Sequence, residues 1–508
     1  MHGLLPDALR RRAAERPTHP AVRARDGELT YAAFWTRSVQ LSHTLRERGV
    51  VSGDRIAILL DNTCDCAVAL HGVWLAGAVT VALNVQTKSE KLGWILRDSG
   101  AVALVAERNS EGTYGPALAG SGVRFVLAAA GSEPVAPEPA PAGARPEDLA
   151  AILYTSGTTG EPKGVMHTHA SLGFTRESVV QYLGLRVDDR ILCALPLSFG
   201  YGLFQLLPSI TVGATLVLEP STSYPAQIFA RMQSEEVTTV AGVPTFFALM
   251  LAHDAKHPLR FPSVRLVTNA AAPLPEGLVA GIGRVFPSAA LVKMYGQTEC
   301  IRACYLPPEM VGRKAEAVGI AIPGTELLLF DDDGREVGVG ETGTLHVRGP
   351  NVMRGYWNDP RRTAAVLVPG PRLGETLLRT GDSFRRDADG VLYFVGRQDE
   401  IIKSRGEKVS PIEVENVIHR IPAVAEVVVL GVPDAVLGEA VCALIVLQEG
   451  ESLEGIEVKR FCSERLEHHM VPKRVLVVAE LPRTPNGKVS RRMVAEKFND
   501  LLTAPSAR

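Results

Sequence analysis

The chain has 508 residues, more than a single hydrophobic core usually serves, so two or more domains are expected. Hydrophobic residues make up 46% of it and charged residues 22%, and the formal net charge is −2, which is the ordinary composition of a soluble globular protein. Because no long run of Lys or Arg is present, this composition argues against a nucleic-acid or stable membrane partner and favours a small-molecule substrate.

Targeting signals are not evident in the sequence. The first 17 residues contain three consecutive arginines but no apolar stretch beside them, which is not typical of a signal peptide. No apolar run approaches the roughly 18 residues of a membrane span. The seven cysteines are an odd number without a C-x-x-C pair, so neither a disulfide framework nor a zinc site is expected. We therefore predict a cytoplasmic protein with reduced thiols.

Short apolar strands and amphipathic helices alternate over the first 330 residues or so. Residues 55–60 have a strand pattern, 66–76 a helical one and 79–83 a strand pattern again, and further strands are predicted at 102–106, 124–127, 215–218, 238–241 and 265–268. This alternation is typical of an α/β fold in which helices cover both faces of parallel sheets. Residues 131–146, rich in Pro, Ala and Glu, are expected to form a surface loop.

The pattern changes at about residue 326. Short strands separated by Asp-Gly turns predict a small β-barrel-like subdomain over 326–398. Beyond it, helices at 411–419 and 456–466 and strands at 425–430, 440–446 and 474–478 predict a small, separate α+β domain. We therefore expect an N-terminal domain over residues 1–398 and a mobile C-terminal domain over 399–508.

A Gly-rich segment, Tyr154–Gly164, stands between a predicted strand at 150–153 and a helix that begins near Thr168. Its glycines let the backbone approach an anion closely, its hydroxyls add donors, and Lys163 adds charge. The spacing G-x-x-G-x-P-K-G differs from the Walker pattern, and no Ser or Thr follows the Lys. The segment predicts a phosphate loop rather than a polar surface turn, with these binding residues: Thr155, Ser156, Gly157, Thr158, Thr159, Gly160 and Lys163.

The same segment resembles the signature of the adenylate-forming superfamily, which comprises acyl-CoA synthetases, peptide-synthetase adenylation domains and luciferases. Four further segments match in the same order, at residues 269–274, 294–299, 379–382 and 482–488. The resemblance spans nearly the whole chain. It implies ATP, Mg²⁺ and coenzyme A as the cofactors and co-substrates of this protein.

The resemblance assigns the nucleotide site residue by residue. Ala271, Ala272 and Pro273 would lie along the adenine, although the family more often has Ser-Gly where this chain has Asn269 and Ala270. In the segment that follows, Tyr295 and Gly296 would contact the adenine, Thr298 the α-phosphate, and Glu299 the magnesium ion. The remaining contacts, to ribose and phosphate, would come from Asp382 and Arg397.

Residues near the predicted domain boundary and in the C-terminal domain would act at different steps of the reaction. The resemblance makes Asp399 the hinge between two domain orientations, one for adenylate formation and one for thioester formation. Lys403, Gly406 and Glu407 would contact coenzyme A in the second orientation. Lys488 would reach the α-phosphate in the first and stabilise charge that gathers in the transition state. The predicted catalytic residues are Lys163, Thr298, Glu299 and Lys488.

The acyl pocket is predicted around the run Ser198–Gly202, which most resembles benzoate-type CoA ligases. Its small walls suit an aromatic or a short, flat acid, although ordinary core packing is the alternative for the two aromatic residues of the run. No acidic residue begins the segment 241–246, where amino-acid activators usually have an Asp. The predicted pocket residues are Phe199, Gly200, Tyr201, Gly242, Ala270, Gly296 and Cys300.

Taken as a whole, the sequence predicts an AMP-forming acid–CoA ligase. It would convert a carboxylic acid and ATP to acyl-AMP and pyrophosphate, and then transfer the acyl group to coenzyme A. An acceptor that is a carrier-protein thiol or an amine is the nearer alternative. A nucleotide-binding regulator without activity is the more distant one, and it is disfavoured because the predicted catalytic and ribose-binding residues occur together. The natural acid and the oligomeric state stay open.

Overall fold

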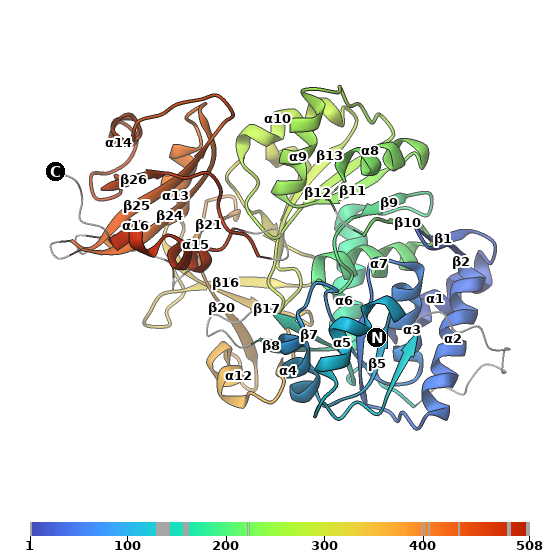
Figure 1. The fold of residues 1–508 in the computed structure, drawn as a ribbon. Helices are drawn as coiled ribbons and strands as arrows, with labels where there is room; N and C mark the ends of the chain where they lie inside the picture. The colour runs from blue at the N-terminus through green and yellow to red at the C-terminus, as the bar shows by residue number, and fades with distance from the viewer. Residues whose placement is uncertain are drawn as a thin grey trace.

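The computed structural model describes residues 3–128, 143–155, 162–220, 222, 224–397, 400, 402–404, 407–434, 437–484 and 489–503. Within these ranges the chain forms a large N-terminal body and a smaller C-terminal one (Figure 1). Figure 1 shows the smaller body in deep orange and red, and the remainder in colours from blue to light orange. None of the helices in the described ranges has the length and apolar character that a membrane crossing requires.

The first large sheet carries the Gly-rich segment at one side. Its seven strands run in the order β18 (Gly355–Tyr356), β8 (Lys163–Thr168), β7 (Leu149–Thr155), β4 (Val79–Ala82), β3 (Arg55–Leu59), β5 (Ala101–Ala106) and β6 (Phe125–Ala128). The chain between these strands forms α3 (Cys64–Leu75), α4 (Ser89–Ser99), η1 (Arg108–Ser110) and α5 (Glu111–Ala117). Helix α3 is apolar all round and almost wholly buried, as expected of a helix with packing partners on every side.

The second large sheet carries the predicted adenine and acyl segments. Its nine strands run in the order β15 (Ile320–Ala321), β14 (Cys304–Leu306), β13 (Ala290–Tyr295), β12 (Leu266–Asn269), β11 (Thr239–Gly242), β9 (Arg190–Cys193), β10 (Thr215–Leu218), β1 (Pro20–Ala24) and β2 (Gly27–Thr30). Its helices are α1 (Leu5–Glu15), α2 (Tyr31–Glu47), α6 (His169–Leu183), α7 (Gly200–Val212), α8 (Pro225–Ser234), α9 (Pro244–Asp254), α10 (Glu276–Val285) and α11 (Pro308–Val311). One apolar core joins both sheets through α3, α6 and α7.

The two large sheets are mixed rather than wholly parallel, and this differs from the sequence-based expectation. The central strands do pair in parallel, for example β3 with β4 and β11 with β12. However, β7 and β8 pair antiparallel, and so do β13 and β14. The reason is connection length, because a short loop can return a strand only as a hairpin, whereas a parallel neighbour needs a crossover of a dozen or more residues.

A third sheet forms the predicted β-rich subdomain. It is antiparallel and consists of β16 (Glu326–Phe330), β17 (Thr342–Arg348), β20 (Thr376–Arg386), β19 (Leu367–Pro369) and β21 (Leu392–Arg397), with α12 (Pro360–Val366) beside it. The α/β class and the β-rich subdomain are therefore confirmed.

The C-terminal body is an α+β unit, as predicted. Its sheet contains β23 (Glu407–Val409), β22 (Ile402–Ser404), β25 (Gly438–Leu447), β24 (Val424–Asp434) and β26 (Arg474–Val477). One face packs on α13 (Pro411–Ile418) and α14 (Gly455–Ser463), and the other on α15 (Arg491–Lys497) and α16 (Asn499–Thr503). The alternating apolar residues of β24 and β25 explain this, since successive side chains in a strand point to opposite faces.

The sequence pattern of residues 490–502 predicts one helix, whereas the structure has two, α15 and α16. The segment is divided at Phe498, whose φ of −108° and ψ of 17° are not helical. After this break the carbonyl of Leu502 accepts a hydrogen bond from the Arg474 guanidinium, which ties the end of α16 to β26.

Candidate active site

The carboxyl ends of β11, β12 and β13 bring three of the predicted segments to one edge of the nine-stranded sheet. Gly242 ends β11 and pairs with Asn269, which ends β12 and in turn pairs with Lys293 of β13. The segments 270–273 and 296–300 therefore start side by side. Ligands of open α/β sheets bind at this edge. Ala271 has a φ of 74°, a left-handed conformation that is costly for a residue with a side chain and is typical of functional sites.

A hydrogen bond fixes Glu299, the predicted magnesium ligand. The Tyr356 hydroxyl, on β18, donates to Glu299 Oε1 over 2.7 Å. Lys163 Nζ lies 5.0 Å from the centre of the same tyrosine ring, so the ammonium faces its π-surface. Burial raises the pKa of Tyr356, and the Glu299 charge raises it further, so the phenol stays protonated and donates. The tyrosine thus connects the predicted phosphate and metal residues.

His167 of β8 supports the neighbouring residue of the same segment. Its Nε2 lies 2.7 Å from the carbonyl oxygen of Thr298, so this nitrogen carries the proton. Burial lowers the pKa of His167 to about 4, which keeps the ring neutral near pH 7. Strand β8 and the segment 296–300 are therefore joined by a neutral hydrogen bond.

Asp382, the predicted ribose ligand, has one carboxylate oxygen engaged and one without a hydrogen bond. Oδ2 accepts from Tyr295 over 2.5 Å and from Gln297 over 2.8 Å. Oδ1 is buried without a hydrogen-bond donor among the described residues, and the nearest guanidinium nitrogen of Arg397 lies 3.9 Å away. Burial raises the pKa of Asp382, because a desolvated carboxylate is disfavoured. A buried acceptor in this state is suited to a ligand hydroxyl.

The predicted acyl wall is compact. Phe199 is the N-cap residue of α7 and is partly buried, whereas Tyr201 is fully buried with its hydroxyl 2.7 Å from Thr268 Oγ1. Ala270 and Cys300 are buried as well. Gly242 has no room for a side chain, because a Cβ there would lie 2.7–2.8 Å from the rings of Phe246 and Phe247. A Cβ on Gly200 would lie 3.6 Å from Ile301, which is an ordinary contact distance.

Comparison with known proteins identifies the family. The model of the AMP-binding enzymes matches residues 9–357, and that of their C-terminal domain matches 413–488. The chain belongs to the AMP-binding enzyme family. A feruloyl-CoA synthase of Amycolatopsis sp is 34% identical over 96% of this chain and 98% of that protein, and an indoleacetate–CoA ligase of Aromatoleum aromaticum is 33% identical over 96% and 97%. The resemblance to acyl-CoA ligases of the adenylate-forming superfamily is thereby confirmed.

Solved structures share the fold of this AMP-binding enzyme over both bodies. ATP-bound MatB from Rhodopseudomonas palustris has a TM-score of 0.90 and 28% identity, and the match covers 99% of this chain and 100% of that one. A benzoate CoA ligase from Burkholderia xenovorans has a TM-score of 0.86 and 29% identity, over 97% and 99%. The amide bond synthetase McbA from Marinactinospora thermotolerans has a TM-score of 0.88 and 28% identity, over 97% and 99%.

Several predicted site residues of this AMP-binding enzyme lie outside the described residues, so their positions stay predictions. In the phosphate loop these are Ser156, Gly157, Thr158, Thr159 and Gly160, and beyond it Asp399, Gly406 and Lys488. The backbones of Lys403 and Glu407 lie in β22 and β23, but their side chains are not described.

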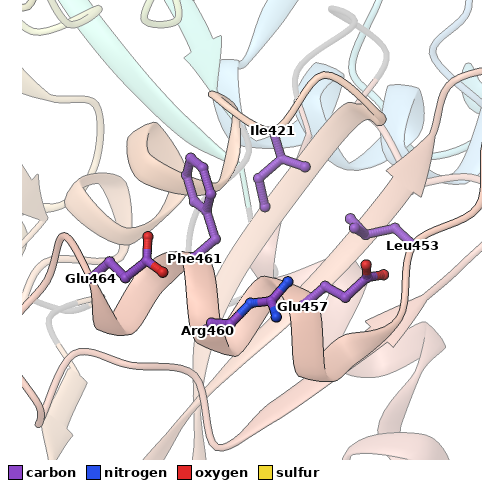
Figure 2. A pocket seen from close by; sticks show the side chains of 6 residues that line it. All are labelled: Ile421, Leu453, Glu457, Arg460, Phe461 and Glu464. Atoms are coloured by element: carbon purple, nitrogen blue, oxygen red, sulfur yellow. The ribbon is translucent and has the colours of Figure 1, made fainter.

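A hollow in the C-terminal body is separate from the predicted site. Figure 2 shows the six side chains that line it, most of them from α14 and its C-cap: Ile421, Leu453, Glu457, Arg460, Phe461 and Glu464. None of them belongs to the predicted site, so this hollow does not contribute to the nucleotide or acyl contacts argued here.

Three supporting residues carry little signal in the sequence, namely His167, Gln297 and Tyr356. Gln297 lies within the segment 294–299, two residues after Tyr295, and this position is its signal. Tyr356 stands in a Gly-Tyr-Trp sequence after an apolar turn, which is a weak signal on its own. His167 has no local signal, because its role depends on the pairing of β8 with β7 and on a partner 131 residues away.

Proposed function

We propose that this chain joins a carboxylic acid to coenzyme A in two steps, the first of which consumes ATP. In the first, a carboxylate oxygen of the acid attacks the α-phosphorus of ATP, the bond to the pyrophosphate breaks, and acyl-AMP forms. In the second, the thiolate of coenzyme A attacks the acyl carbonyl and AMP leaves. Support comes from relatives named for feruloyl-CoA, indoleacetate–CoA and benzoate–CoA ligation, which also favour an aromatic acid.

Two arrangements support this proposal most directly. Tyr356 contacts both Lys163 and Glu299, through its ring and its hydroxyl. Tyr295, four residues before Glu299, donates a hydrogen bond to Asp382 of the third sheet. Asp382 Oδ1, which has no hydrogen-bond donor among the described residues, is suited to a ribose hydroxyl, and Lys163 to a phosphate. Such fixed charges and dipoles lower the barrier by positioning the reactants and by stabilising the charge that develops on phosphate oxygens.

Glu299 fits a magnesium ion, because Tyr356 holds Oε1 and the described residues give Oε2 no hydrogen bond. The described residues contain no group of three or more His, Cys, Asp or Glu side chains suited to a metal. A hard cation such as Mg²⁺ does not need such a group, because one carboxylate and the substrate phosphates would hold it. The ion would neutralise phosphate charge, while the protein residues orient the acid and the nucleotide.

The proposed acid is aromatic or short and flat, in keeping with Phe199 at the N-terminal end of α7 and with the buried Tyr201. An amine is the second candidate acceptor, because the amide bond synthetase named above shares the fold. A carrier-protein thiol is a third. The chemistry of the first step is the same for all three.

The test is pyrophosphate release by the full chain with a panel of aryl and short aliphatic acids, each with and without coenzyme A, followed by mass detection of the product. We expect acid-dependent release and a thioester. Release without any thioester, but with amide in the presence of amines, would favour the second candidate. No acid-dependent release in any mixture would overturn the proposal.

A further inference from the structure

Arg302 is a buried arginine beside the predicted acyl wall. It comes three residues after Glu299 and just before β14, and 5% of its surface is exposed. Its guanidinium carbon lies 4.8 Å from the centre of the Tyr201 ring and 5.9 Å from that of Phe204. Both rings belong to α7, so the cation packs on the helix that begins directly after Phe199.

The charge on Arg302 is not balanced by the residues around it. No carboxylate of the described residues forms an ion pair with it, and its Nε is buried without a hydrogen-bond partner there. One other guanidinium nitrogen donates to the carbonyl of Ile301 over 2.8 Å. The aromatic faces offset part of the desolvation cost, but a buried cation without a counter-charge is expensive.

The ionisable neighbours cannot supply that charge. Burial raises the pKa of Tyr182 to about 12, with the Arg302 guanidinium opposing the rise, and burial also raises the pKa of Tyr201. Both phenols are therefore neutral near pH 7. The missing negative charge has to come from outside this cluster.

The backbone holds Arg302 in place. The side-chain amide of Asn351 donates to the carbonyls of Arg302 over 2.7 Å and of Cys300 over 3.3 Å. Ile301 has a φ of 60°, an unfavourable conformation for a β-branched residue that persists only when its surroundings impose it. The guanidinium is thus preorganised, as a binding group has to be.

A second buried donor without a hydrogen bond among the described residues lies at the carboxyl end of β12. Asn269 ends this strand and pairs with Gly242 of β11. It is 2% exposed, and its Nδ2 has no hydrogen-bond partner among the described residues. A buried donor without a partner is rare in folded proteins, and here it indicates a ligand with acceptor atoms.

We propose that Arg302 binds a second anionic group of the acid, so that the natural substrate is a dicarboxylic acid or an acid with a comparable oxyanion. One carboxylate is activated near Thr298, and the other meets the guanidinium over Tyr201. This inference rests on the proposed function. It narrows the substrate class, since a site built to pair a buried charge rejects an analogue that lacks the partner.

The experiment compares each diacid with its mono-methyl ester and with the corresponding monoacid, using the three benzenedicarboxylates with benzoate, and succinate with propionate. We expect kcat/KM for the best diacid to exceed that of its ester by about 10- to 100-fold, which corresponds to one hydrogen-bonded charge pair. Arg302→Met should bring this ratio close to one, mainly through KM of the acid, and leave KM for ATP unchanged. Arg302→Lys should keep part of the preference.

A stability measurement separates this role from a structural one. Because the charge of Arg302 is unpaired, Arg302→Met should leave the thermal midpoint of the ligand-free enzyme unchanged or raise it. Arg265→Met is the matched control: its guanidinium bonds to the buried Asp189, so this variant should lower the midpoint. A lowered midpoint in Arg302→Met, equal to the control, would show that Arg302 only supports the fold.

The outcomes are distinct. Activation of monoacids and esters with no preference for any diacid would overturn this inference and leave the proposed function intact. A diacid preference that Arg302→Met retains would overturn it as well. Absence of pyrophosphate release with every acid would overturn the proposed function, and the inference with it.

Discussion

The Tyr356 hydroxyl fixes the orientation of the Glu299 carboxylate, which is the group most sensitive to position in the proposed site. Tyr356→Phe removes this bond with little change in volume. Residues that orient a metal ligand typically contribute about 10- to 100-fold to metal affinity or activity. We expect acid-dependent ATP–pyrophosphate exchange to fall by about this factor and to need more Mg²⁺ for half-maximal rate.

Tyr393→Phe is the control for this prediction, because the Tyr393 hydroxyl also donates to a carboxylate, Asp387, but outside the proposed site. It should leave the Mg²⁺ dependence unchanged. Equal Mg²⁺ dependence in Tyr356→Phe and the wild type would show that Glu299 does not depend on this bond.

We expect the Asp382 carboxylate to lower the unfolding free energy of the ligand-free enzyme and to strengthen ATP binding. Its pKa is raised by burial, so the native state binds this proton more tightly than the unfolded state does. The free energy of unfolding therefore falls as pH rises from the ordinary value of 3.8 through the raised one. Asp382→Asn should raise or keep the thermal midpoint at pH 7, and should weaken ATP binding by roughly tenfold or more. Calorimetric titration with ATP checks the second effect.

Asp387 is the control, because its pKa is lowered whereas that of Asp382 is raised. Burial opposes ionisation there, but hydrogen bonds from Lys314, Tyr393 and backbone amides prevail and lower its pKa to about 2. Its stabilising contribution is present above pH 3.8 and is lost as pH falls toward 2. Asp387→Asn should lower the midpoint at pH 7 without a change in ATP binding. Loss of ATP binding in Asp387→Asn, or a lowered midpoint in Asp382→Asn, would contradict this account.

At the scale of elements, the turn after β13 brings the backbone of Gly296 close to that of Ile301 and Arg302. A Cβ on Gly296 would lie 2.4 Å from the carbonyl oxygen of Ile301 and 2.8 Å from the Cα of Arg302. Gly296→Ala should therefore cost about 1–3 kcal/mol in unfolding free energy and shift the segment that carries Glu299. Gly283 of α10 is the control, because a Cβ there meets nothing within 4 Å and alanine favours helix.

We expect Gly296→Ala to lose acid-dependent exchange and Gly283→Ala to keep it with equal or higher stability. Denaturant titration and exchange assays on the two variants measure both effects. Unchanged exchange in Gly296→Ala would show that the turn tolerates the shift.

Local patterns predicted most single elements but not their pairing. The strand predicted at 55–60 is observed at Arg55–Leu59, and Thr168, named as the start of a helix, is the N-cap residue of α6. By contrast, the antiparallel return of β8 was missed, because the pattern of alternating strands and helices does not show where a short loop reverses the chain. The contacts of Tyr356 and His167 depend on that return.

For the candidate site, local segments predicted the individual residues but not the contacts between them. Residues inside recognisable segments, such as Glu299 and Asp382, are placed at one edge by the fold. That Asp382 uses one oxygen to hold Tyr295 and Gln297 could not be predicted, since it depends on two strands from different sheets. Arg302 has a local signal, as the only charged residue between Cys300 and Leu306, but the motifs of the predicted site do not include it.

At the scale of the whole molecule, an exposed ion pair between Glu316 and Arg420 joins the two bodies over 3.1 Å. The side chains are 54% and 53% exposed, and such pairs contribute about 0–1 kcal/mol. This pair is therefore compatible with the predicted turn of the C-terminal body about Asp399.

Lys488 tests that motion. If the C-terminal body turns between the two steps, this lysine can reach the α-phosphate in only one orientation. Lys488→Ala should slow adenylate formation by about 10²–10³-fold, the scale of one lost charge stabiliser. The same variant, supplied with synthetic acyl-adenylate and coenzyme A, should form thioester at close to the normal rate. Equal losses in the two separately measured steps would make Lys488 a residue of general support.

The Arg491 ion pairs have a mechanical consequence. Arg491 donates to Glu400 over 2.8 Å and to Glu415 over 2.6 Å, and burial between two carboxylates fixes it at the start of α15. Residue 400 follows the predicted hinge, and residue 491 follows Lys488. These ion pairs therefore tie Glu400 to the start of α15. If the chain turns at the predicted hinge, we expect the small body to rotate as one rigid unit, and the segment that follows Lys488 to move together with Glu400.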